Sequence, residues 1–521
     1  MSSRSNLLRN ITAFTAVTAC ILHAATAFAQ SAPGPNRASG DATGWLSASH
    51  DPQHTGVSSV ASQPLHRIRW STPVDLQPPV GDILIHYGSP LVTAENTVII
   101  PVKTGADSFR IEARKGKNGA LLWKMATDYS LPPNPGFMLS LSPVISKNRL
   151  IIPAAGGAVI VRNNPDEKKS ASKRLVFYGI ENYNAFPTVY DANVKINTPI
   201  TADAHGNLFF GFVVIGQLPI NLQSGIARIA ADGTASWISA AAVSQDIFGG
   251  LNNNKAMNAS APALSRDEKL LYLGVNLFDC GPGDLVALDS TTLQLRHSVR
   301  LTDPRFGFDA CASDSSSASP TIGPDGDVYF GVLENPFPAH NDRGWLLHFN
   351  RDLSQQKIAG SFGWDNTASI VKASLVPSYK GTSKYLLMTK YNNYAGVGSG
   401  DGVNKIAILD PNVAMADPVL GNAVMKEVLT IVAPTPDPRF PGFPGAVREW
   451  CINTAAVDPF TRSIIANSED GKLYRWDLTT NKFSQVIKLT GGIGEAYTPT
   501  VIGTDGTVYA INNAMLFAIG K

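Results

Sequence analysis

The sequence has 521 residues, of which 44% are hydrophobic and 16% are charged, and its net charge is +2. Soluble domains average about 25% charged residues, so this chain is poor in charge. A nearly neutral chain excludes nucleic acid as the main partner, because binding to phosphates needs a basic surface. Four cysteines in this length exclude a disulfide-dense scaffold.

Residues 1–29 have the pattern of an export signal. Two arginines precede an apolar run from Ile11 to Leu22, and a small-x-small sequence ends at Ala29. We predict a signal peptide that is cleaved after Ala29, and a periplasmic or secreted mature protein. The competing interpretation is a lipobox at Val17–Cys20, which would place a lipid anchor on Cys20. No later apolar run approaches the roughly 18 residues of a transmembrane helix, so none is expected.

One pattern is then repeated eight times along the chain. A Ser-Pro, Thr-Pro or related dipeptide begins a short apolar strand, a polar turn follows, and a second strand rich in aromatic and β-branched residues returns. This is the pattern of a β-hairpin, and repeats of this length are typical of propeller blades. The eight dipeptides end at Pro90, Pro143, Pro199, Pro262, Pro320, Leu375, Ala455 and Pro499.

A third strand with a second turn follows the hairpin. The segments Ala113–Trp123 and Ala227–Trp237 both place Ala, Gly and Trp at the same spacing. This spacing resembles the A-x-D-x-x-x-G-x-x-x-W repeat of the pyrroloquinoline quinone (PQQ)-like, quinoprotein alcohol dehydrogenase-like propellers, and residues 45–58 resemble the opening of that family. The resemblance implies an all-β fold, an eight-bladed β-propeller of four-stranded antiparallel blades.

The last repeat stops one strand early, at Lys521. We expect the N-terminal segment around residues 65–72 to supply the missing outer strand, because this closure removes an exposed sheet edge. The expected organisation is a signal peptide over 1–29, a lead segment over 30–60 and the propeller over 61–521.

The blade topology sends two sets of loops to the same face, those between blades and those between the second and third strands of a blade. These loops are the long ones in this sequence, so we expect binding on that face. Cys280 and Cys311 both emerge there, which predicts a disulfide in an oxidising compartment. The state of Cys451 is left open.

Residues just before each innermost strand are expected to line the mouth of the central channel. In the PQQ dehydrogenases a quinone lies there on a Trp, with a calcium ion held by oxygen ligands. The resemblance therefore implies candidate residues for three roles here. The metal candidates are Glu495, Asn258 and Asp314; the cofactor candidates are Trp364, Lys372, Trp450 and Asn258; the candidates for a catalytic base are Glu449 and Asp365.

Two functions remain open. The chain lacks the adjacent cysteine pair of many PQQ alcohol dehydrogenases, and it has no C-x-x-C-H site for a c-type haem. We therefore favour a binding or scaffolding propeller at the bacterial cell envelope, similar to the propeller subunit of the outer-membrane β-barrel assembly machinery, with envelope proteins or a small molecule bound on the long-loop face. The alternative is a PQQ- and calcium-dependent dehydrogenase that oxidises an alcohol or a sugar.

Overall fold

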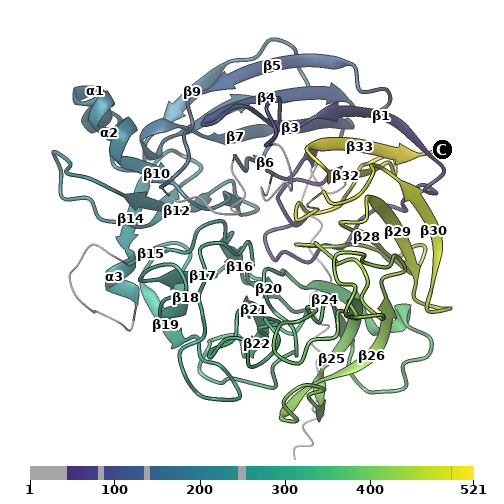
Figure 1. The fold of residues 1–521 in the computed structure, drawn as a ribbon. Coiled ribbons are helices and arrows are strands. Elements are labelled where there is room, and N and C mark those ends of the chain that lie inside the picture. Colours follow the sequence, from purple (N-terminus) through teal and green to yellow (C-terminus); the bar gives the residue numbers. More distant parts are fainter. Residues whose placement is uncertain (1–43, 80–86, 134–140, 245–253, 495) are drawn as a thin grey trace, which may run out of the picture. The chain divides into compact units, whose positions relative to one another are not determined.

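Eight antiparallel sheets follow one another around a ring in the computed structural model (Figure 1). The structure describes residues 44–79, 87–133, 141–244, 254–494 and 496–521. The eight-bladed β-propeller predicted from the repeats is confirmed. The predicted signal peptide over 1–29 and the lipid-anchor candidate Cys20 lie outside the described residues, as does the first part of the lead segment.

The first four blades occupy the first half of the ring. Blade one contains β2 (Leu91–Val92), β3 (Thr97–Gly105), β4 (Ser108–Lys115) and β5 (Leu121–Thr127). Blade two contains β6 (Val144–Ser146), β7 (Arg149–Pro153), β8 (Val159–Asn163) and β9 (Ser172–Leu175), with the 3-10 turn η1 (Ala155–Gly157). Blade three contains β10 (Val194–Ile196), β11 (Thr201–Ala202), β12 (Leu208–Val214), β13 (Gly225–Ile229) and β14 (Ala235–Ser239). Blade four contains β15 (Lys255–Ala256), β16 (Ala263–Leu264), β17 (Leu270–Asn276), β18 (Gly283–Asp289) and β19 (Leu295–Arg300).

The other four blades complete the ring. Blade five contains β20 (Thr321–Ile322), β21 (Val328–Val332) and β22 (Trp345–Phe349). Blade six contains β23 (Ser369–Lys372), β24 (Tyr385–Tyr391), β25 (Lys405–Ala416) and β26 (Ala423–Val432), with the 3-10 turn η2 (Ala373–Leu375). Blade seven contains β27 (Ala456–Asp458), β28 (Ser463–Asn467), β29 (Lys472–Asp477) and β30 (Lys482–Lys488), and blade eight contains β31 (Val501–Ile502), β32 (Val508–Asn512), β33 (Met515–Gly520) and β1 (Arg67–Pro73). The short helices α1 (Ile180–Ala185), α2 (Pro187–Asn193) and α3 (Ala240–Val243) lie in loops between blades.

The position of a strand within its blade determines its burial. The innermost strands β2, β6 and β27 are buried along their whole length. The outermost strand β30 alternates between exposed and half-buried residues, because one of its faces meets the neighbouring blade and the other meets water. Blade five departs from the expected four strands. In place of a fourth strand it has two isolated bridges, Leu346 with Gly360 and Phe349 with Gln356.

The N-terminal strand closes the ring, as predicted. β1 pairs with β33 in antiparallel register from Arg67 opposite Gly520 to Pro73 opposite Met515. The Trp70 indole N–H donates a hydrogen bond to the Gly116 carbonyl in blade one, at 2.9 Å. The strand therefore completes blade eight and also joins it to blade one.

One of the eight predicted starting points is wrong. Blade six begins with β23 at Ser369, and the predicted anchor Leu375 lies in η2, after that strand. The dipeptide that stands in the anchor position is Thr367-Ala368, which lacks the proline found at most other blades. Without the proline, the apolar residues after β23 resemble a strand start equally well.

The turn before the outermost strand needs a left-handed backbone. Gly119 and Gly233, the glycines of the repeat, have φ of +72° and +94°. In blade four Leu293 takes this position with φ +59° while its side chain is buried. Packing against the blade therefore holds a leucine in a conformation that glycine adopts without strain.

The lead segment is built into the ring. Its backbone forms hydrogen bonds with the innermost strands of six blades, in a path from Trp45–Val92 in blade one to Ser58–Val457 in blade seven. Between these ends, backbone N–H groups of blades two, four, five and six donate to backbone carbonyls of the segment. The accepting carbonyls are those of Leu46, Pro52, Gln53 and Thr55, in that order. Innermost strands face the ring axis, so residues 45–58 follow the inside of the channel. In the described part of the chain, no helix is long and apolar enough to cross a membrane.

Candidate functional site

Two of the predicted metal ligands, Asn258 and Asp314, lie together between blades four and five. The Asn258 backbone N–H donates to Asp314 Oδ1 at 3.3 Å, and the Asn258 side-chain oxygen accepts from Asn197 Nδ2 at 2.9 Å. Lys255, in β15, places its Nζ 2.6 Å from both Asp314 carboxylate oxygens. Asn276 Nδ2 also donates to Asp314, at 3.1 Å. The chain's own ammonium group therefore neutralises the carboxylate that was predicted to bind calcium.

Asp365, a predicted catalytic base, is buried and holds two blades together. Its Oδ1 accepts from the Ser317 backbone N–H at 2.7 Å and from the Ser317 hydroxyl at 2.6 Å. Its Oδ2 lies 4.0 Å from Nζ of Lys390, which is at the end of β24. The Lys390 side chain is fully buried and lies over the Tyr497 ring, with Nζ 4.7 Å from the ring centroid. Through these contacts, Asp365 joins the loop that precedes blade five to the loop that precedes blade six.

Glu449, the other predicted base, belongs to a cluster formed by the loop before blade seven and the turn between β28 and β29. One ligand atom from each of Glu449, Cys451 and Glu469 lies within 4.8 Å of the others. The Glu449 backbone N–H donates to Glu469 Oε1 at 3.0 Å, and Arg439 Nη2 lies 2.5 Å from the same oxygen. Arg439 therefore compensates the negative charge of this carboxyl pair through a direct contact with Glu469.

The electrostatics of this cluster set Glu449 apart. Burial and the negative charge of Glu469 raise the pKa of Glu449 to about 7, although Arg439 and Lys390 oppose the shift. Burial also raises the pKa of Glu469, while Arg439 opposes it. Burial, assisted by the negative charge of Glu449, raises the pKa of Tyr394. Glu449 can therefore gain or lose a proton near neutral pH, as a general base or a proton-linked binding group must.

The predicted cofactor residues do not form one site. Trp450 is fully buried, and its indole packs against Tyr474 and Phe483. Lys372 is exposed at the end of β23 opposite Tyr385, whereas Lys390 occupies the other end of the neighbouring strand β24. Lys372 therefore lies away from the channel mouth, and sequence reasoning missed Lys390.

Trp364 is half-buried beside this region and is held by a buried arginine. The Arg343 carbonyl accepts from the backbone N–H groups of Gly363 and Trp364, at 2.9 and 3.0 Å. The Arg343 guanidinium donates to the carbonyls of Ser361 and Asn392 and lies 4.4 Å from the centroid of the Tyr391 ring. These contacts fix the loop that carries Trp364 and Asp365.

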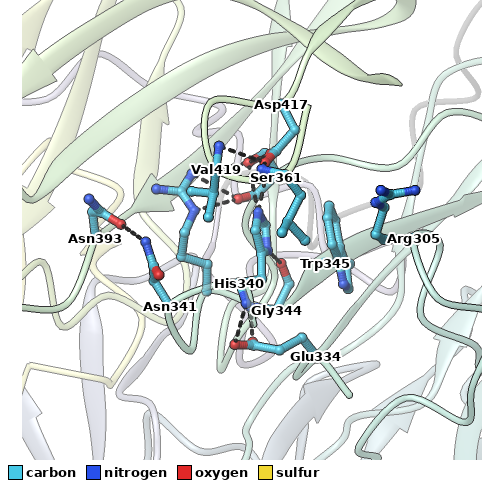
Figure 2. A network of polar contacts seen from close by, with 12 residues as sticks. Arg305, Glu334, His340, Asn341, Gly344, Trp345, Ser361, Asn393, Asp417 and Val419 are labelled. Carbon is cyan, nitrogen blue, oxygen red and sulfur yellow. Dashed lines mark hydrogen bonds and ion pairs between the residues drawn. The ribbon is translucent and has the colours of Figure 1, made fainter. Parts of the chain in front are cut away.

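Next to this arginine lies a polar network that was not predicted from the sequence (Figure 2). His340 Nε2 contacts Asp417 Oδ2 at 3.1 Å, Nδ1 contacts the Gly344 carbonyl at 3.1 Å, and the ring stacks on Trp345 at 3.9 Å. The Ser361 hydroxyl donates to the same Asp417 oxygen. Both ring nitrogens of His340 face oxygen acceptors, so the imidazole is held between Asp417 and Gly344.

Serine, histidine and aspartate together raise the question of a hydrolase triad. A nucleophilic serine needs a histidine nitrogen with a free lone pair to take its proton. Here Nε2 of His340 faces the Asp417 carboxylate, and the Ser361, His340 and Asp417 side chains are buried from solvent. The network therefore braces blades five and six, and it has no access to a substrate.

The structure joins Cys280 and Cys311 by a disulfide, with Cα atoms 4.3 Å apart, while Cys451 is a buried thiol. The bond ties the loop between β17 and β18 to the loop that enters blade five. The neighbouring Asp279 accepts from the Ser313 hydroxyl and from the Asp314 backbone N–H, at 3.0 and 2.7 Å. The remaining predicted ligand, Glu495, lies outside the described residues.

No family model matches the sequence, and no curated protein matches it. Solved structures match its fold. A europium-containing methanol dehydrogenase is similar with 12% identity and a TM-score of 0.54, over 90% of this chain and 89% of that chain. A quinohemoprotein alcohol dehydrogenase from Comamonas testosteroni is similar with 10% identity and a TM-score of 0.54, over 92% and 81%.

BamB from Moraxella catarrhalis shares 10% identity over 87% of this chain and 97% of that chain, with a TM-score of 0.42. At these identities the likeness concerns the fold alone. The chain is thus an eight-bladed β-propeller with the fold of the quinoprotein alcohol dehydrogenases, and its activity has to be argued from its own residues.

Proposed function

We propose that this protein is an exported propeller that binds a partner at the bacterial cell envelope and does not work as a calcium-dependent quinone dehydrogenase. The observation that carries the proposal is the contact between Lys255 and Asp314. A calcium ion prefers several oxygen ligands that include carboxylates. Here the ammonium group lies 2.6 Å from both oxygens of Asp314, and Asn258 already accepts from Asn197. These residues do not fit a calcium ion, because it would have to displace Lys255.

Export is supported by the leader-like residues 1–29 and by the disulfide. Disulfides persist mainly in oxidising compartments such as the periplasm. Cys280 and Cys311 are bonded across two loops of the same face. N-terminal sequencing of the protein recovered from the periplasm tests cleavage after Ala29, and mass spectrometry tests for a lipid on Cys20.

A calcium titration separates the two functions. We expect calorimetry on the purified mature protein to show no calcium binding at micromolar concentrations, and added PQQ to leave its absorbance spectrum unchanged. Dye-linked oxidation of a panel of alcohols and sugars should stay at the level of the buffer control. Micromolar calcium binding together with turnover would overturn the proposal.

One group favours the second candidate, a dehydrogenase acting on an alcohol or a sugar. The pKa of Glu449, raised to about 7, suits a general base at neutral pH. If turnover is found, Glu449→Gln should remove it, whereas Asp365→Asn should mainly lower stability because Asp365 is bonded to Ser317. Turnover that survives Glu449→Gln would exclude this role for Glu449.

A further inference from the structure

Four exposed phenylalanines gather on the long-loop face over blades four and five. They are part of three loops, residues 277–282, 301–310 and 333–344. Gly281 pairs with Ala312, and Cys311 pairs with Leu333, so the three loops lie side by side. We name these residues the phenylalanine patch: Phe278, Phe306, Phe308 and Phe337, with exposed fractions of 56%, 39%, 57% and 50%.

The middle loop of the patch is held rigidly by a buried aspartate. Asp303 Oδ1 accepts from the backbone N–H groups of Arg305 and Phe306, at 2.8 and 3.0 Å. Its Oδ2 accepts from the Trp345 indole at 2.7 Å and from the Asn335 backbone N–H at 3.2 Å. One carboxylate therefore fixes the tip of this loop and joins it to the loop that carries Phe337.

Two further contacts brace the same loops. The Cys280–Cys311 disulfide joins the loop of Phe278 to the chain three residues beyond Phe308. Arg300 donates to both oxygens of Asp309, at 2.7 and 3.0 Å. The rings of Phe306 and Phe308 are nearly parallel, with an interplanar angle of 10°. The patch is thus presented in one arrangement.

Exposed aromatic side chains contribute little to the stability of the ring that carries them, because their apolar area stays in water. Scattered single residues of this kind need no explanation, but a cluster on rigid loops is typical of an interaction surface. Four of the six phenylalanines that are exposed in the described residues lie in this patch. Because the loops are already ordered, binding would cost little further conformational entropy.

The charges around the patch distinguish a protein partner from a membrane. Anionic membranes attract clusters of lysine and arginine. The three loops contain no lysine, and Arg343 is buried. Arg300, which lies just before the middle loop, forms an ion pair with Asp309. Arg305 is exposed, and its guanidinium lies 5.8 Å from the Phe306 ring centroid with no carboxylate partner among the described residues. The exposed Arg305 beside four phenylalanine rings complements a partner segment that is apolar and also carries an acidic residue.

We propose that the phenylalanine patch is the docking site for an apolar segment of a partner protein, with an acidic side chain of that segment paired with Arg305. The proposal rests on the binding function proposed above and names its surface and the chemistry of the partner. Aromatic rings and an arginine at the centre of a contact are the residues that most often dominate binding energy.

The test uses linear peptides selected from a displayed random library against the full-length mature protein. We expect the selected peptides to combine apolar and acidic residues and to bind Phe308→Ala and Phe337→Ala at least about tenfold more weakly than the wild type. Phe460→Ala is the matched control, because Phe460 is 61% exposed on the turn between β27 and β28, at the opposite end of the blades. Thermal unfolding should be unchanged in all three variants, because each side chain is exposed.

A charge exchange tests the pairing with Arg305. Arg305→Glu should weaken the binding of an acidic peptide. Replacing the acidic residue of that peptide by lysine should restore its affinity for this variant. The proposal is overturned if no peptide is selected, or if the selected peptides bind the patch variants as tightly as the wild type. Binding to phosphatidylglycerol vesicles or self-association that depends on Phe308 would assign the patch to a membrane or to a second copy instead. These outcomes do not depend on calcium or PQQ, so they separate a failure of the patch from a failure of the proposed function.

Discussion

Lys255 and Asp314 form a mostly buried ion pair inside the propeller, with Nζ 2.6 Å from both carboxylate oxygens. The two residues come from different blades, since β15 belongs to blade four and Asp314 precedes β20 of blade five. The pair occupies the place where the sequence suggested a metal ion. Removing the ion pair tests how much the stability of the inner rim depends on this charge pairing.

Lys255→Met should destabilise the fold by about 3 kcal/mol, because it leaves the Asp314 carboxylate buried without its partner. Adding Asp314→Asn should recover part of this loss, since the unpaired charge is then absent. Urea unfolding of the two single variants and the double variant measures the coupling. Arg296→Ala, at an exposed ion pair with Asp289, is the control and should cost at most about 1 kcal/mol.

Asp417 should make the fold sensitive to strong acid. Burial alone would raise its pKa, but His340 and Ser361 together lower it to about 2 from the usual 3.8. Its contribution to stability, about 2 kcal/mol, is present above pH 4 and is lost as the pH falls through 2. The difference in unfolding free energy between wild type and Asp417→Asn should therefore shrink from pH 5 to pH 2. Glu95→Gln, on an exposed turn, should show no such trend.

Arg343→Lys should loosen the loop that carries Trp364. Lysine cannot reproduce the donors that arginine gives to Ser361 and to Asn392, so buried carbonyls lose their partners at a cost of about 3 kcal/mol. Hydrogen exchange of residues 361–367 should become faster in this variant. Unchanged exchange there would show that the loop is held without Arg343.

The Cys280–Cys311 disulfide closes a loop with a sequence separation of 31 residues. Chain-entropy arguments predict a stabilisation of about 3–4 kcal/mol for a loop of this size. Replacing both cysteines by serine should lower the unfolding free energy by that order, and reductant should have the same effect on the wild type. Cys451→Ser keeps the bond and should remain sensitive to reductant.

Ring closure predicts a cost that extends beyond blade eight. Deleting residues 60–72 removes β1 and exposes the edge of β33, so the whole ring should unfold at a lower denaturant concentration. Trp70→Ala should give a smaller change, since it removes the contact with Gly116 and the packing near Tyr509. Closure by β1 would be refuted if the truncated protein melts like the full chain.

Local patterns in the sequence were enough to predict the fold. Hairpin turns repeat from blade to blade, the Ala-Gly-Trp spacing recurs in blades one and three, and an outer strand missing at Lys521 pointed to closure by the N-terminus. The blade-six start was wrong where the repeat lost its proline. Lys372 lies at the exposed end of β23, and the buried Lys390 lies on the next strand, β24.

The candidate site depended on contacts between blades, which no repeat encodes. The sequence pattern singled out Asn258 and Asp314 as oxygen ligands for a metal ion and Glu449 as a catalytic base, and the structure places Asn258 beside Asp314. Whether such a group binds a ligand depends on what faces it, here Lys255 for Asp314 and Ser317 for Asp365. The ring could be predicted from the amino-acid pattern alone, because each blade is a local hairpin pattern. The chemistry of its face became visible in the folded protein, because charge pairing and burial arise between residues far apart in the chain.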